Sequence, residues 1–192
     1  MPADIRSSFE SSRAVLESAL ADAGYLEAAR RAAQLCSERL QAGSKVMLAG
    51  NGGSAADAQH IAGELVGRFR YDRPALSAIA LTTDTSILTA LGNDYGFETV
   101  FARQVEAHGR AGDVLMCFST SGQSANVLAA LAAARARSIH TIGFSGSSGG
   151  SMTAVCDIIL RVPSDDTPRI QEVHIMTAHA ICELIERTCF PR

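Results

Sequence analysis

The stretch Lys45-Val-Met-Leu-Ala-Gly-Asn-Gly-Gly-Ser54 decides the fold of this chain. Its first half is a short, uninterrupted apolar run, which is typical of a strand buried on both faces of a parallel sheet. Its second half is a glycine-rich turn, and residues 54–69 after it have the pattern of a helix. A strand, a tight turn and a helix in this order predict an α/β unit.

The chain after this unit repeats the alternation. Apolar runs predict four more strands, at 77–81, 113–118, 139–144 and 157–162, and helices are predicted at 86–91, 101–107, 124–137, 151–155 and 168–188. The pattern predicts a doubly wound, five-stranded parallel sheet with helices on both faces. Ligands of such sheets collect at the carboxyl ends of the strands.

Two amphipathic helices are predicted before the alternation, at 5–22 and 26–41, with Gly24 and Gly43 as the breaks after them. Because they precede the α/β pattern, they are expected to be a structural extension or an oligomer contact. We therefore expect one domain over 1–192, in which residues 1–43 contribute to oligomerisation and residues 44–192 form the α/β core.

The composition excludes several classes of protein. Hydrophobic residues make up 47% and charged residues 19%, which is ordinary for a globular protein, and the net charge of −3 gives no basic footprint for nucleic acid. No segment has the apolar length of a membrane span or the apolar core of a signal peptide. The five cysteines form neither a CxxC pair nor an even framework, which indicates buried thiols in a reducing cytoplasm.

The first loop, residues 50–55, has two interpretations. Its Gly50-x-Gly52-x-x-Ala55 pattern matches a dinucleotide fingerprint, for which Asp84 would supply the acidic residue at the end of the second strand. The pattern is weak alone, because such turns occur in sheets of many functions. With Ser54 as N-cap and Asp57 as its capping-box partner, the helix start would instead hold an anion or a sugar oxygen.

The second loop favours a phosphate. Phe118-Ser-Thr-Ser-Gly-Gln-Ser124 offers four hydroxyls, turn amides and a helix N-terminus, but no lysine. A phosphomonoester therefore fits better than a nucleoside triphosphate, whose Walker loop requires a lysine. The third loop, residues 143–150, is also rich in glycine and serine, and we interpret it as a flexible connection, with a place in the lining of the site as the alternative.

Two predicted helices carry candidates for chemistry. His60 and Glu64 are four residues apart on one helix face, which suits an acid/base or metal-ligand pair and equally a hydrogen bond on the helix surface. His179 lies in an apolar stretch of the last helix, which is predicted to begin with Thr167 as N-cap and Pro168 at the first position. Both Gln171 and Glu172 are spaced to share a face with His179, and spacing does not decide between them. Asn93 and Asp94 are predicted to form a turn, with hydrogen bonding to a polyol as the functional alternative.

These motifs occur in a recognisable order. The chain has Gly50-Asn-Gly-Gly-Ser54 with Asp57, His60 and Glu64, then Ser119-Thr-Ser-Gly122 with Ser124, then Arg169-Ile-Gln-Glu-x-His174 with His179. In this combination it resembles the sugar isomerase (SIS) domain over nearly its whole length. Within that family it is similar to the bacterial phosphoheptose isomerases.

The resemblance implies an aldose–ketose isomerase. Its members interconvert D-sedoheptulose 7-phosphate and D-glycero-D-manno-heptose 7-phosphate through a cis-enediol, the first step towards the activated heptose of lipopolysaccharide or capsule. They are homotetramers with active sites built between subunits. The substrate-binding positions implied in this sequence are Asn51, Gly52, Gly53, Ser54, Glu64, Asn93, Asp94, Ser119, Thr120, Ser121, Ser124 and Gln171.

The resemblance also implies a zinc ion in each subunit, held by His60, Glu64, Gln171 and His179, which selects Gln171 over Glu172. Glu64 and His179 are the implied acid/base pair. Glu64 as base and His179 as proton donor is one workable division, and the reverse is the other. Zinc would polarise the carbonyl, or would mainly organise the site, since a fully coordinated Glu64 is not a free base.

A non-catalytic relative is the main alternative. Some SIS-domain proteins bind the replication initiator instead of a substrate, and Arg73-Pro-Ala-Leu76 with Arg169-Ile-Gln171 resembles them too. Those proteins characteristically lack the acid and the histidine that stand here at Glu64 and His179. The sequence therefore favours the enzyme.

Overall fold

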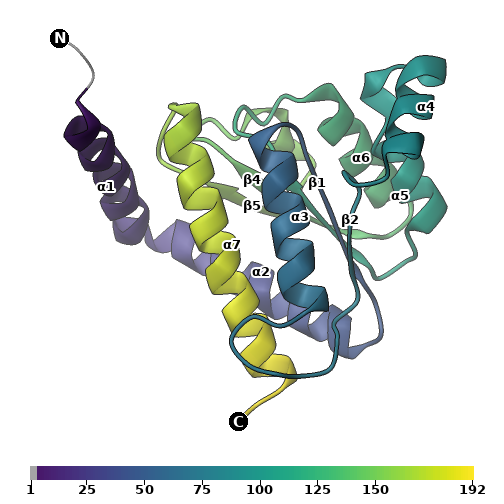
Figure 1. Cartoon of the computed structure of the whole chain (residues 1–192), viewed down its shortest axis with the longest axis horizontal. Helices are drawn as coiled ribbons and strands as arrows, with labels where there is room; N and C mark the ends of the chain where they lie inside the picture. The colour runs from purple at the N-terminus through teal and green to yellow at the C-terminus, as the bar shows by residue number, and fades with distance from the viewer. Residues whose placement is uncertain (1–3) are drawn as a thin grey trace.

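Five parallel strands form one sheet in the order β2-β1-β3-β4-β5 in the computed structural model, which describes residues 4–192 (Figure 1). The strands are β1 Val46–Gly50, β2 Ala78–Ala80, β3 Val114–Phe118, β4 His140–Ser145 and β5 Ile158–Arg161. The order reverses between β1 and β3, which makes the carboxyl ends of these two strands the topological switch point. The predicted five-stranded, doubly wound fold is confirmed.

Helices cover both faces of the sheet. They are α1 Ile5–Ala21, α2 Ala23–Gln41, α3 Gly53–Val66, α4 Thr85–Tyr95, α5 Ala102–His108, α6 Ala125–Ala136 and α7 Thr167–Cys189, with 3-10 turns η1 Phe97–Thr99 and η2 Gly150–Ala154. α2, α3 and α7 pack together on one face, and α5 and α6 pack on the other. α3 and α7 run side by side and in the same direction, starting at the carboxyl edge of the sheet (Figure 1).

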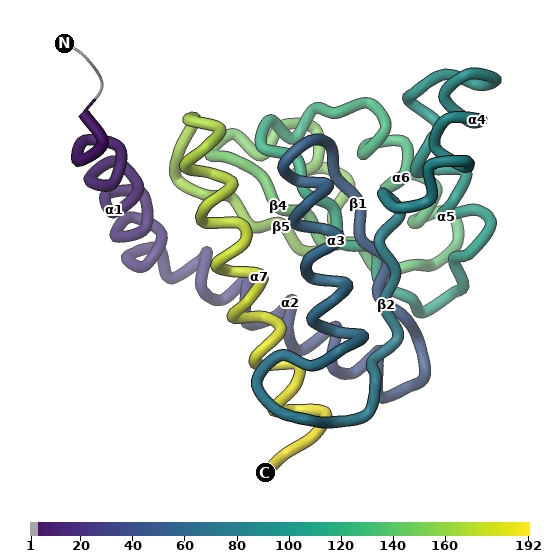
Figure 2. Tube along the Cα trace, viewed as in Figure 1, coloured from purple at the N-terminus to yellow at the C-terminus, as the bar shows by residue number. Residues whose placement is uncertain are grey.

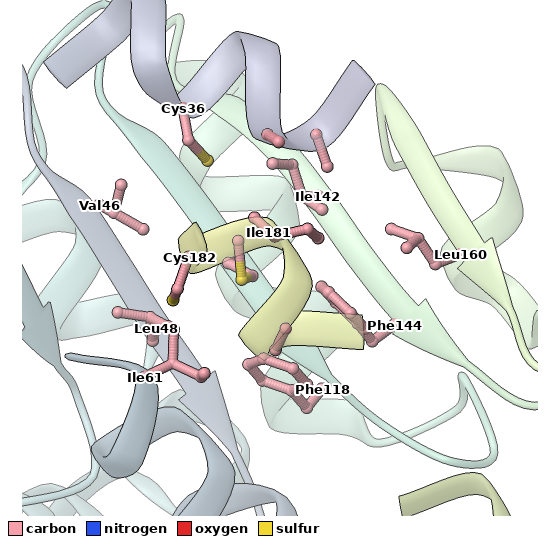
Figure 3. Close-up of a cluster of buried hydrophobic side chains, with 14 of the residues drawn as sticks. Cys36, Val46, Leu48, Ile61, Phe118, Ile142, Phe144, Leu160, Ile181 and Cys182 are labelled. Carbon is pink, nitrogen blue, oxygen red and sulfur yellow. The ribbon is translucent and has the colours of Figure 1, made fainter. Parts of the chain in front are cut away.

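The apolar strands divide their side chains between two cores. In β1, Val46 and Leu48 face the core under α2, α3 and α7, whereas Met47 faces the core under α5 and α6. All five β1 residues are buried, as the uninterrupted apolar run predicts. Figure 3 shows the first core, where Phe118 and Phe144 from adjacent strands lie below α7.

Two predicted boundaries in the helical regions are wrong. Asp22, and not Gly24, separates α1 from α2, because its carboxylate accepts a hydrogen bond from the Tyr25 N–H and so starts the second helix. The turn predicted around Asn93 and Asp94 is also absent. α4 continues through both residues and ends at Tyr95, just before Gly96, whose φ of 90° favours glycine.

The predicted caps of α3 and α7 are wrong as well. The turn before α3 uses Gly52 with a φ of 56°, so the helix starts at Gly53 and Ser54 is a buried first-turn residue. Asp57 forms no capping-box bond, and one of its carboxylate oxygens is buried without a hydrogen-bond partner. In α7 the cap position is Asp166, and Thr167 is the first helical residue.

The five cysteines are free thiols. Cys36, Cys117 and Cys182 are buried, and Cys156 and Cys189 are partly buried. Within residues 4–192, no helix combines the length and apolar character needed to cross a membrane.

Candidate active site

A small cavity lies at the switch point, between the loops that follow β1 and β3. Its volume is about 280 Å³, and we call it the loop pocket. It is lined by Asn51, Gly52, Gly53, Ser54, Phe118, Ser119, Thr120, Ser124, Thr167 and Gln171. The two loops that the sequence marks as ligand loops therefore meet at one place, together with the start of the last helix.

The loop pocket attracts anions without a charged side chain. Among the described residues that line it, none is ionisable. Three helices begin there, however: α3 at Gly53, α6 just after Ser124 and α7 at Thr167. Helix N-termini carry partial positive charge and free N–H groups. The hydroxyls of Ser119 and Ser124, which are 3.0 Å apart, add further donors, so the pocket suits a phosphate.

Asn51 is fixed by a residue that the sequence analysis missed. Its side-chain amide exchanges two hydrogen bonds with the amide of Asn126, both of 2.9 Å. Asn126 is buried in the first turn of α6. The available signal was a lone polar side chain near the start of an alanine-rich helix, two residues after Ser124.

The third loop does more than connect two elements. A Cβ atom added to Gly122 would stand 2.2 Å from the carbonyl oxygen of Gly149, so the second and third loops touch backbone to backbone. The N–H of Met152 also donates to the Gly122 carbonyl, at 3.3 Å. The interpretation of residues 143–150 as a flexible connection is therefore corrected, because residues at its end support the serine-rich loop.

A group of three titratable side chains lies between α3 and α7, further along these helices from the loop pocket. It consists of His60, Glu64 and His179, and we call it the histidine cluster. Nε2 of His60 lies 2.7 Å from Nε2 of His179 and 3.4 Å from a carboxylate oxygen of Glu64. The imidazole of His60 is about half exposed, and Glu64 is mostly buried. The i,i+4 spacing on α3 and the α3–α7 packing together produce this cluster.

One imidazole in the cluster and one carboxyl group near it have shifted pKa values. Burial, together with the nearby His60 and Arg70, lowers the pKa of His179, and Glu64 opposes this effect. His179 is therefore kept towards its neutral form. Burial raises the pKa of Asp57 to about 6, against the opposing influence of His60.

The donor set of the histidine cluster fits zinc. Two imidazoles and one carboxylate are zinc ligand types, and three protein ligands leave a position open for water or substrate. The candidate ligand atoms lie within 4.8 Å of one another. The side chains of this chain are thus arranged as a metal site requires.

The structure separates Gln171 from Glu172, which the spacing did not. The side-chain amide of Gln171 lies against Gly53 and lines the loop pocket. Glu172 is exposed and pairs with Arg169 at 3.2 Å. Gln171 lies eight residues before His179, about 12 Å along the helix, so it belongs to the pocket end of α7.

Besides Glu64, which lies in the histidine cluster, three predicted substrate residues lie outside the loop pocket. Asn93 and Asp94 are exposed on α4, where their side chains bond to each other at 2.7 Å. Ser121 is exposed, and its hydroxyl accepts from the Gln123 N–H. Asp84, the acidic residue of the nucleotide interpretation, accepts from the Ile87 N–H as the cap of α4.

His174 is a further residue to which the sequence analysis gave no role. It is fully buried beside Phe118 and Phe144, and its Nε2–H donates to the Ser145 carbonyl at 3.1 Å. Burial lowers its pKa to about 4, so the ring is neutral. Gly146, which follows Ser145, donates its N–H to the backbone carbonyl of Thr120. His174 therefore supports the strand end beneath the loop pocket.

Known proteins share both the sequence and the fold. A family model described as the SIS domain matches residues 9–146. The chain is 54% identical over 186 residues to the phosphoheptose isomerase of Burkholderia pseudomallei (strain K96243), covering 97% of this chain and 94% of that protein. It is 58% identical over 175 residues to that of Bradyrhizobium sp. (strain ORS 278), covering 91% and 88%. The solved phosphoheptose isomerase of Neisseria gonorrhoeae superimposes with a TM-score of 0.89 at 46% identity, covering 95% and 96%.

Proposed function

The chain belongs to the phosphoheptose isomerases of the SIS-domain family, and we propose that Glu64 and His179 carry its aldose–ketose isomerisation. The reaction interconverts D-sedoheptulose 7-phosphate and D-glycero-D-manno-heptose 7-phosphate. The observation that supports the roles best is the position of the histidine cluster below a charge-free pocket that suits a phosphate. The initiator-binding alternative gains no support, because Glu64 and His179 are present and lie close together.

The two parts of the site match the two ends of the substrate. The phosphate binds at the three helix N-termini of the loop pocket, with Ser119 and Ser124 as hydroxyl donors. Gly53 and His60 are seven residues apart, about 10 Å along α3. A seven-carbon sugar phosphate is long enough to span this distance, which brings its C1 and C2 to the histidine cluster.

Moving the carbonyl between C1 and C2 requires two proton transfers. A base removes the proton from the carbon beside the carbonyl, an acid protonates the carbonyl oxygen, and a cis-enediol results. We assign the first transfer to the Glu64 carboxylate and the second to the His179 imidazole. A neutral imidazole, which the lowered pKa of His179 favours, still donates its N–H proton to an oxyanion.

We further propose that the histidine cluster holds one zinc ion per subunit, with His60, Glu64 and His179 as ligands. Gln171, the fourth ligand that the resemblance implies, lines the loop pocket about 12 Å along α7 from His179, so the fourth position is open to water or substrate. When bound, zinc supplies Lewis-acid stabilisation of the oxyanion. A residue that ligates through its reactive atom is not free for proton transfer. The proposed roles of Glu64 and His179 therefore require either that coordination shifts during turnover or that zinc mainly organises the site, and removal of the metal distinguishes the two.

The enzyme is proposed to be a cytoplasmic homotetramer with sites shared between subunits. α1 exposes Ile5 and Phe9, at 73% and 72%, which suits an oligomer contact. Asn93 and Asp94 on α4 lie outside the loop pocket of their own chain, as expected if they serve a neighbouring subunit. Five free thiols suit a reducing compartment. The product would feed lipopolysaccharide or capsule synthesis.

The direct test is incubation with sedoheptulose 7-phosphate, followed by NMR, before and after dialysis against a chelator. We expect the heptose 7-phosphate to form, and we expect chelation to slow its formation and added zinc to restore it. No conversion by the metal-loaded protein would overturn the assigned reaction. Unchanged turnover after verified metal removal would overturn the zinc proposal alone.

A further inference from the structure

An ion pair between Arg73 and Glu186 is buried at the far ends of α3 and α7, away from the loop pocket. Nε of Arg73 lies 3.1 Å from a carboxylate oxygen of Glu186, and the two side chains are only 2% and 1% exposed. Burying two charges is costly unless their hydrogen-bonding groups find partners. The partners of this pair therefore indicate what it holds in place.

Arg73 binds the end of α3 that carries Glu64. Its guanidinium donates to the backbone carbonyl of Glu64 at 2.8 Å and to that of Leu65 at 2.7 Å. Carbonyls in the last turn of a helix have no partner within the helix. Arg73 supplies that partner and so fixes the backbone of Glu64 directly.

Glu186 binds the loop that leaves α3. Its two carboxylate oxygens accept from the N–H groups of Phe69, at 2.8 Å, and Arg70, at 2.7 Å. Burial alone would raise the pKa of Glu186, but these amides and Arg73 outweigh it, so the pKa is lowered and the group is charged. Figure 2 shows this loop passing the C-terminal end of α7 before it enters β2.

The same loop forms one wall of the histidine cluster. The ring of Phe69 lies 5.6 Å from the imidazole of His179, centroid to centroid. The guanidinium of Arg70 lies 5.1 Å from the Phe69 ring. Glu186 follows His179 by seven residues, two turns along α7. The buried pair thus connects the backbone of Glu64, the helix of His179 and the aromatic ring beside His179.

We propose that the Arg73–Glu186 pair is a positioning device, which sets the separation and orientation of Glu64 and His179 without touching the substrate. The inference rests on the proposed roles of Glu64 and His179. A pair of apolar side chains would fill the same volume, often without loss of stability. Apolar groups would not bind two carbonyls and two amides, so positioning is what the charges contribute.

The chain contains a matched control beside the amino ends of the central strands. Asp113 accepts from two backbone amides, of Lys45 and Arg110, and also pairs with the Lys45 ammonium. This is the same bonding pattern as that of Glu186, and it lies at the amino ends of β1 and β3. Asp113→Asn therefore measures what losing such a cluster costs when no catalytic group is nearby.

The test compares Glu186→Gln, Arg73→Lys and Asp113→Asn by Tm, kcat, KM and the pH dependence of kcat with sedoheptulose 7-phosphate. We expect all three to lower Tm. Glu186→Gln should lower kcat by about 10- to 100-fold with KM within about twofold, since a small misplacement of reacting groups has effects of this size. Arg73→Lys keeps the charge but lacks the planar fork, so its kcat should stay low. Asp113→Asn should keep the wild-type kcat.

Wild-type kcat and an unchanged pH profile in Glu186→Gln and Arg73→Lys would overturn the inference. If neither variant folds, Phe69→Leu decides, because it alters only the ring beside His179. A severalfold lower kcat with a displaced pH profile supports positioning, and wild-type behaviour contradicts it. Glu64→Gln in the same assay separates the two hypotheses. If it retains full turnover, the proposed roles fail; if it alone is inactive, only the positioning inference fails.

Discussion

The two ends of the α3–α7 pair differ in how they produce function. At the upper end, the loop pocket is built from glycines, hydroxyls and helix N-termini, and none of its described lining residues is charged. Lower down, the histidine cluster consists only of titratable groups. With the proposed roles, binding and proton transfer are separate tasks, one performed by backbone groups and neutral hydroxyls and the other by titratable side chains.

The largest expected effect comes from the histidine cluster. Glu64→Gln and His179→Ala should each lower kcat at least about 100-fold, or roughly 3 kcal/mol, because each removes a group that we propose acts in the transition state. KM should change little, and each variant should elute like the wild type in size-exclusion chromatography. A large rise in KM with normal kcat would show that binding and chemistry are not divided in this way.

The next effect concerns His174, which supports the pocket from within the core. The pKa of His174 is about 4 in the folded protein and about 6.5 in the unfolded chain. Its contribution to stability is therefore complete above pH 6.5, and it is lost as the pH falls towards 4, because the unfolded chain then binds the proton more readily. Between pH 7 and pH 5 the loss should be roughly 2 kcal/mol. Urea unfolding of the wild type and His174→Gln at both pH values measures it. Equal losses in the two proteins would contradict the prediction.

A smaller effect is expected from the hydroxyls of the loop pocket. Ser119→Ala and Ser124→Ala each remove one donor to the phosphate, which should raise KM about tenfold and leave kcat within about twofold. Steady-state kinetics checks both values. A fall in kcat of the size seen for the histidine cluster would remove the distinction between the two ends.

The smallest effect is expected at Ser121. Its hydroxyl is exposed and already accepts the Gln123 N–H, outside the loop pocket lining. Ser121→Ala should therefore raise KM only about two- to threefold, by the low end of the range for one hydrogen bond. A tenfold rise would instead place Ser121 among the main phosphate ligands.

The sequence predicted the sheet well because each strand carries its own signal. The run at Val46–Gly50 is buried on both faces, and no distant residue is needed to recognise it. The helix ends were harder to predict. Gly92 and Asn93 have the composition of a turn, yet α4 continues to Tyr95 and stops before Gly96, which has a positive φ. Composition shows which residues permit a turn, and not which of them make it.

The site was predictable only in part, for a similar reason. His60 and Glu64 show helical spacing within one segment, but His179 is 119 residues from His60 and was joined to it by resemblance alone. Arg73 and Glu186 are 113 residues apart, and neither stands in a pattern that predicts the other. Contacts between distant segments depend on how α3 and α7 pack, which no local pattern records.

The three helix N-termini at the loop pocket have a consequence for regulation and for evolution. Their partial charges belong to the peptide backbone, so no proton added within the working pH range and no single side-chain substitution removes them. Substrate capture should therefore follow the ionisation of the phosphomonoester itself, whose second pKa is about 6, while turnover follows the histidine cluster. In a chain of this design, the catalytic groups can change while the binding of sugar phosphates is kept.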